Sequence, residues 1–186
     1  MNKLILFFSF LLISFSISAK DVMGTFNSYD DFINNNMDTM DGYIGFGHAK
    51  GAVTLRFIKD SVEKKVKCKE IWGFMLGGRL YRVDQKMGQP AYVLSIGKII
   101  YYENGLSYMD AYKTKKATGV FTIGYLCYFS KNMNSEMIPY DTKIPEANDR
   151  FKEFKKSNTK FAELFKCIGK TDDYSKLRGC VKSFNN

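Results

Sequence analysis

The stretch Glu70–Asp84, EIWGFMLGGRLYRVD, decides how the middle of this chain folds. Because it contains three glycines followed by an arginine, we first ask whether it forms a phosphate-binding loop. A P-loop has the form GxxxxGK[ST], in which a lysine and a hydroxyl lead into a helix. Here Gly77-Gly78 is followed by Arg79–Asp84, an alternating run rich in β-forming residues. The stretch is therefore interpreted as a β-hairpin and not as a nucleotide site.

A two-residue turn at the glycine pair fixes which residues of the hairpin face each other. The expected cross-strand pairs are Leu76 with Arg79, Phe74 with Tyr81, and Trp72 with Val83. Such pairs stabilise a hairpin by about 0.2–1 kcal/mol each. We expect Trp72, Phe74 and Leu76 to share one side, which faces the core. Gly73, on the other side, leaves room for a close approach of the backbone.

Short strand-like runs surround the hairpin and are separated by turn residues such as Gly97 and Asn104-Gly105. A strand–turn–strand unit is expected over Gly42–Gly51, and the other candidate strands are 52–58, 69–75, 79–84, 91–96, 98–103 and 118–129. Runs of this length and spacing are typical of an antiparallel sheet, here of about six or seven strands.

Helical signals lie at the two ends of the chain. Ser28 is a candidate N-cap of a short helix with acidic residues in its first turn. From Pro145 onward, apolar residues recur every three or four positions up to Gly169, with a possible break at Asn158. Thr171 is a candidate cap of one further, shorter helix. The sequence thus predicts an α+β protein with a short N-terminal helix, an antiparallel sheet and two or three C-terminal helices.

The N-terminus is typical of a secretory signal peptide. Lys3 is followed by the apolar run Leu4–Ile13, and small residues then lead to Ala19, where we expect cleavage. The apolar run is shorter than the roughly 20 residues that span a bilayer, and no other segment is a transmembrane candidate. We therefore expect an exported protein, periplasmic or extracellular, with a signal peptide at 1–19 and a single globular domain at 20–186. That domain is β-rich over 42–129 and helical over 145–186.

Charge and cysteine content narrow the classes of partner and site. The formal net charge of +9 could indicate a nucleic-acid partner. However, lysine and glutamate alternate along the C-terminal helical faces, and an exported protein rarely meets nucleic acid. We therefore expect no nucleic-acid partner. Four cysteines in an exported chain indicate disulfides. Three pairings are possible; Cys167 with Cys180 is preferred because both lie in the C-terminal helical region, and Cys68 with Cys127 is the less certain second pair.

No compact set of catalytic or cofactor-binding residues is evident. There is no Cys-x-x-Cys, and His48 is the single histidine, so no metal or cofactor is predicted and no catalytic residue is assigned. Four tyrosines could line a surface for sugars or peptides, namely Tyr101, Tyr102, Tyr108 and Tyr112. The alternative interpretation is that they are half-buried sheet residues.

The segment Phe26–Asn35, FNSYDDFINN, followed by Trp72-Gly73-Phe74 and Gly78-x-Leu80-Tyr81, carries a resemblance. It resembles a group of exported Bacteroidetes-type proteins that contain a domain of unknown function and open with Y-x-S-Y-x-D-F-x-N-N. The resemblance covers roughly residues 23–110. This chain departs from the group at Asn36-Met37, where a proline tends to follow, and at Gly77-Gly78, where Asp-Gly is frequent. The resemblance implies export and architecture, and it implies no activity.

Two functional classes follow from the sequence. The first is an exported, non-enzymatic module that binds a protein or another component of the cell envelope. The alternative is a hydrolase-type enzyme whose site is assembled from scattered acids and His48. A shallow aromatic groove without converging polar groups favours the first, and a pocket that joins His48 to a carboxylate and a hydroxyl or thiol favours the second.

Overall fold

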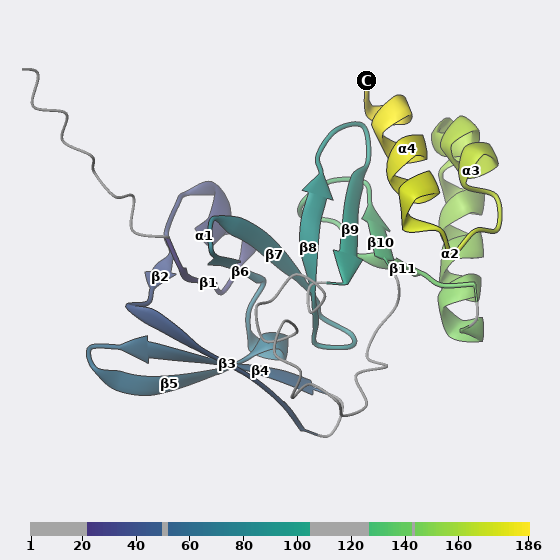
Figure 1. The fold of residues 1–186 in the computed structure, drawn as a ribbon. Helices are drawn as coiled ribbons and strands as arrows, with labels where there is room; N and C mark the ends of the chain where they lie inside the picture. The colour runs from purple at the N-terminus through teal and green to yellow at the C-terminus, as the bar shows by residue number, and fades with distance from the viewer. Residues whose placement is uncertain (1–21, 50–51, 105–126, 143) are drawn as a thin grey trace, which may run out of the picture.

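A computed structural model describes residues 22–49, 52–104, 127–142 and 144–186. Within these ranges the chain is an α+β protein with two antiparallel sheets and four α-helices (Figure 1). The predicted fold class is confirmed, whereas the strands are more numerous than expected. The predicted signal peptide at 1–19 lies outside the described residues.

The described strands are eleven in number. They are β1 (Gly24–Phe26), β2 (Asp38–Thr39), β3 (Gly42–Ala49), β4 (Ala52–Lys59), β5 (Val62–Lys67), β6 (Gly73–Leu76), β7 (Arg79–Asp84), β8 (Gln89–Ser95), β9 (Ile100–Asn104), β10 (Cys127–Ser130) and β11 (Ile138–Tyr140). Eight of them form a large sheet in the order β11-β10-β9-β8-β7-β6-β1-β2, and β3-β4-β5 form a small one. The α-helices are α1 (Tyr29–Ile33), α2 (Pro145–Ser157), α3 (Ala162–Ile168) and α4 (Tyr174–Asn185).

The β6–β7 hairpin forms as the sequence predicts. Gly77 and Gly78 have φ angles of 57° and 70°, the left-handed region that a type I′ turn requires. Leu76 pairs with Arg79 and Phe74 with Tyr81. A Cβ on Gly73 would lie 2.5 Å from the carbonyl oxygen of Tyr81, so the close backbone approach expected there is present.

One part of the hairpin prediction is wrong. Phe74 and Leu76 pack on the side of the sheet that faces β3-β4-β5, but Trp72 packs on the opposite side, against Phe26 and Phe32. The reason is that β6 begins only at Gly73, so the alternation of side chains does not extend back to Trp72.

The two faces of the large sheet are covered by different elements. One face packs on the small sheet at the β6–β8 end and on α2, α3 and α4 at the β9–β11 end. In Figure 1 the three C-terminal helices stand together beside β10 and β11, away from the small sheet. The other face is covered by α1 and by Met133 and Met137 of the β10–β11 connection. The central strands are thus buried on both sides.

The helix ends follow local sequence signals, with one exception. Ser28 and Asp31 form a capping box at α1, Pro145 opens α2, and Gly169 ends α3 with a φ of 61°. Asn158 separates α2 from the 3₁₀ turn η4 (Thr159–Phe161) as expected. The prediction that Thr171 caps the last helix is wrong. Asp173 caps α4 instead, because its carboxylate accepts hydrogen bonds from the N–H groups of Ser175 and Lys176.

Two glycines allow a matched stability test of these backbone conformations. Gly78→Ala should lower the free energy of unfolding by about 1–2 kcal/mol, because φ is 70° there. Gly179→Ala should raise it by about 0.5–1 kcal/mol, since Gly179 lies inside α4 and an added Cβ meets nothing within 4 Å. Urea unfolding of both variants measures the two changes. The same sign for both would contradict the assigned conformations.

Candidate functional site

The two described tyrosines of the predicted ligand surface, Tyr101 and Tyr102, are buried. Tyr101 and Tyr102 are 1% and 0% exposed, because β9 lies inside the large sheet with both faces covered. Tyr101 points under the C-terminal helices, and Tyr102 points to the opposite face. These two residues are core residues and not a ligand surface. Tyr108 and Tyr112 lie outside the described residues.

The cysteines divide into one disulfide and two buried thiols. Cys167 and Cys180 are joined by a disulfide, with Cα atoms 5.8 Å apart. The second pairing is wrong: Cys68 and Cys127 are free, and each is buried in a different core cluster. Burial raises the pKa of Cys68 to about 12 and raises the pKa of Cys127 as well. Both remain protonated thiols at neutral pH, which excludes them as ready nucleophiles.

His48, the residue of the enzymatic alternative, lies in β3, where its backbone pairs with Val53 of β4. The described part of the chain contains no group of three or more His, Cys, Asp or Glu residues that could hold a metal ion.

A groove lies between α2 and the β10–β11 connection, and we call it the α2 groove. Its volume is about 580 Å³. On the helix side it is lined by residues one turn apart, and on the other side by the connection and Lys86; the lining residues are Lys86, Lys131, Ser135, Glu136, Ile138, Asp149, Arg150, Glu153, Phe154, Ser157 and Asn158. Phe154 and Ile138 give it an apolar floor, and charged groups of both signs form its rim.

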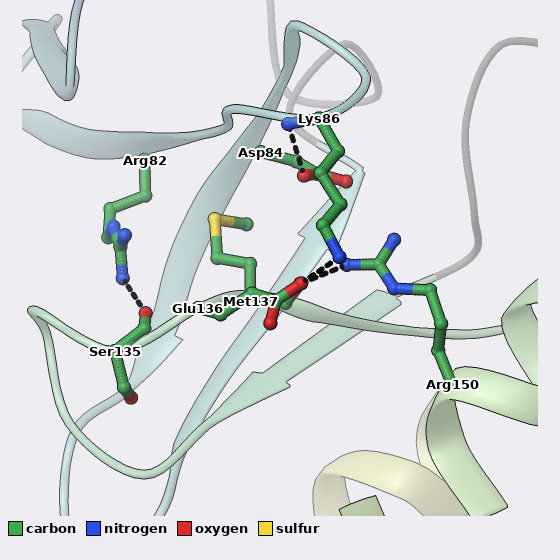
Figure 2. Close-up of polar contacts among 7 residues, drawn as sticks. All are labelled: Arg82, Asp84, Lys86, Ser135, Glu136, Met137 and Arg150. Carbon is green, nitrogen blue, oxygen red and sulfur yellow. Dashed lines mark hydrogen bonds and ion pairs between the residues drawn. The ribbon is translucent and has the colours of Figure 1, made fainter. Parts of the chain in front are cut away.

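Glu136 is the polar centre of one end of the groove. Its carboxylate accepts from the Lys86 ammonium at 2.7 Å and from Arg150 at 2.9 Å, and Arg150 also donates to the Met137 carbonyl at 3.1 Å. Figure 2 shows this carboxylate between the two cations, which come from the β7–β8 turn and from α2. Burial acts to raise the pKa of Glu136, but the hydrogen bonds and charges of Lys86 and Arg150 outweigh it, so that its pKa lies below its usual value.

Arg82 supports the groove from behind. It is 4% exposed, its guanidinium lies 5.0 Å from the centre of the Trp72 ring, and it donates to the Tyr102 hydroxyl at 3.3 Å and to the Ser135 carbonyl at 3.0 Å. The hydrogen bond to Ser135 is visible in Figure 2. Because Arg82 and Arg150 both bind carbonyls of the β10–β11 connection, the wall of the groove is fixed in place.

Asp84 lies next to this cluster and is 2% exposed. Its Oδ1 accepts from the N–H of Lys86 at 3.1 Å, and among the described residues its Oδ2 has no hydrogen-bond partner. Burial raises the pKa of Asp84, while the charge of Arg150 acts in the opposite direction. Asp84 therefore carries a buried, incompletely satisfied carboxylate at the base of the turn that supplies Lys86.

The raised pKa of Asp84 gives a pH-dependent prediction. A carboxyl whose pKa is higher when folded stabilises the protein below its unfolded pKa, here 3.8, and that stability is lost as the pH rises through the folded pKa. Asp84→Asn retains an oxygen for the Lys86 N–H and removes the charge. We expect the variant to gain stability relative to wild type as pH rises from about 4 to 7, measured by urea unfolding at each pH. A difference that is independent of pH would contradict the burial effect.

Only one feature of the sequence pattern points to the α2 groove. Its residues come from three separate segments, and none of them belongs to a motif. Arg82 lies in a predicted strand, yet nothing in that strand indicates that its guanidinium is buried. The one usable signal was the helical spacing of α2, which leaves Asp149, Glu153 and Ser157 on an exposed side.

No protein-family model, curated protein or solved structure matches this chain. Among the described residues, no helix has the length and apolar character needed to cross a membrane.

Proposed function

We propose that this protein is an exported, non-enzymatic module that binds a protein partner of the cell envelope through the α2 groove. The observation that carries the proposal is the groove itself, about 580 Å³ with an apolar floor and a rim of both charges. The signal-like residues 1–19 and the Cys167–Cys180 disulfide support an oxidising, exported location.

The dimensions of the groove favour a short peptide segment as the bound element. Along α2 it extends from Asp149 to Asn158, which at 1.5 Å per residue is about 13–14 Å. An extended peptide rises about 3.3 Å per residue, so about four residues fit this length. Phe154 and Ile138 provide the surface on which an apolar side chain of the partner packs.

The rim charges favour a partner that carries both signs. Three cations and three anions surround the groove, namely Lys86, Lys131, Arg150, Glu136, Asp149 and Glu153. Lys86 and Arg150 bind Glu136, and Asp149 binds Lys152 at 2.8 Å. Lys131 and Glu153, both exposed, are the rim residues best placed to select the partner's charges.

Site-specific photocrosslinking in the native envelope tests the proposal. A benzophenone amino acid at Ser157, which is exposed in the groove, should form a discrete protein adduct; the same amino acid at Ser183, exposed on α4 outside the groove, should not. Adding Lys131→Glu and Glu153→Lys should abolish the adduct while leaving the melting temperature unchanged, since both are surface charges. Equal crosslinking at Ser157 and Ser183, or an adduct that survives the charge reversal, would refute the groove as the binding surface.

A further inference from the structure

A second, smaller hollow lies on the opposite side of α2 from the groove. Its volume is about 280 Å³, and it is lined by Tyr140, Thr142, Asn148, Phe151, Lys152, Lys155, Gly169 and Lys170. The helix contributes Asn148, Lys152 and Lys155, which are spaced by four and three residues and therefore share one face. We call it the lysine pocket. We propose that it binds a phosphate or sulfate ester.

The charged side chains that line the lysine pocket are all cationic. Lys152 and Lys155 come from α2, and Lys170 follows the end of α3. Three carboxylates lie just outside the lining. Asp149 pairs with Lys152 at 2.8 Å, and Asp172 accepts a hydrogen bond from the Thr142 hydroxyl. Asp141 accepts a hydrogen bond from the Ile144 N–H at 3.1 Å. The Asp149–Lys152 pair is exposed on both sides, and such pairs contribute at most about 1 kcal/mol, so an anionic ligand can compete for Lys152.

The remaining lining suits an ester with a compact organic body. The buried rings of Tyr140 and Phe151 form the apolar side of the pocket. The Tyr140 hydroxyl is hydrogen-bonded to the backbone of Thr171, and Asn148 donates to the Thr142 carbonyl. These polar groups therefore stabilise the walls of the pocket, and the lysines are the groups that would bind the anionic part of the ester. Lysine ammonium groups bind phosphate oxygens as point charges.

The helix ends near the lysine pocket add no net positive charge to it. At the start of α2 the N-cap Ile144 supplies no side-chain acceptor, but the Asp141 carboxylate accepts a hydrogen bond from the Ile144 N–H at 3.1 Å, and Glu146 lies in the first turn. These carboxylates offset the partial positive charge of the helix N-terminus. The partial negative charge at the carboxyl end of α3 is offset in turn by Lys170, next to Gly169. The positive charge of the pocket therefore comes from its three lysines.

Nuclear magnetic resonance titration of the disulfide-intact chain with glucose 6-phosphate tests the proposal. We expect saturable shifts of the Gly169 and Asn148 amides in the millimolar range, and none with uncharged glucose. Lys152→Gln with Lys170→Gln should weaken binding about tenfold. The matched control is Lys156→Gln with Lys166→Gln, which removes the same charge from exposed sites outside the pocket and should leave the affinity within about twofold.

The outcomes separate the possible sources of the ester. Sedimentation with phosphatidylcholine vesicles that contain phosphatidic acid, showing the same variant dependence, would support a membrane-borne phosphate. Binding of glucose 6-phosphate without vesicle binding would support a soluble ester. The absence of saturable shifts, or equal weakening in both double variants, would overturn the proposal. None of these results depends on Lys131 or Glu153, so the test stands apart from that of the α2 groove.

Discussion

Replacing Arg178 with methionine should lower the free energy of unfolding by about 3 kcal/mol. Arg178 on α4 forms a bidentate ion pair with Glu103 of β9, with N–O distances of 2.6 and 2.5 Å. The Glu103 side chain is 3% exposed and also accepts from the Tyr101 hydroxyl at 2.9 Å. Methionine keeps the apolar stem of arginine but leaves the buried carboxylate without its cation. The expected loss is at the lower end for a broken buried pair because Arg178 itself is half exposed.

A second substitution distinguishes the ion pair from simple packing. Glu103→Gln together with Arg178→Met removes the buried charge and retains an oxygen for Tyr101, so the double variant should recover part of the loss. Lys176→Met, at an exposed position of the same helix, is the control and should change stability by less than about 0.5 kcal/mol. Equal losses in the single and double variants would show that the charge on Glu103 is not the cause.

The elements that the sequence predicted correctly are those set by local chemistry. The Gly77-Gly78 turn, the Ser28 cap, Pro145 at the start of α2 and Gly169 at the end of α3 each depend on residues close in sequence. Such signals act through the backbone conformation of one or two residues, and distant packing does not alter them here.

The missed strands lack these signals. β5 has the sequence VEKKVK, and lysines on an edge strand protect it from pairing with other chains rather than mark it as a strand. β1 and β11 are three residues long, and β2 is two. They are strands because their neighbours supply hydrogen-bonding edges, which a local pattern does not contain. The division into two sheets depends on the same long-range pairing.

The residues of the candidate site could not be predicted from the sequence, for a related reason. Tyr101 and Tyr102 have the composition of a binding surface, and only the position of β9 within the sheet shows that both are buried. Conversely, Arg82 and Arg150 resemble surface cations in the sequence, yet each binds carbonyls of the β10–β11 connection. Burial is decided by the order of the strands, and that order follows from contacts between residues far apart in the chain.

Removing the Cys167–Cys180 disulfide should also lower the free energy of unfolding by about 3 kcal/mol. The bridge closes a segment with a sequence separation of 13, and a loop of that size restricts the unfolded chain by about this amount. It joins α3 to α4 across the turn at 169–173. Helix α4 continues past Cys180 to Asn185, and the Cα atoms of the two cysteines lie 5.8 Å apart. The pairing therefore depends on how the two helices cross.

The test uses Cys167→Ser with Cys180→Ala, because Cys167 is exposed whereas Cys180 is 4% exposed and packs in the core beneath the helices. At about 2–4 °C per kcal/mol for a chain of this size, we expect the melting temperature to fall by about 6–12 °C. A reducing agent should lower the melting temperature of the wild type by a similar amount and leave the double variant unchanged, since Cys68 and Cys127 are free thiols already. If the reducing agent affected the double variant as strongly as the wild type, another pairing would be responsible for the stabilisation.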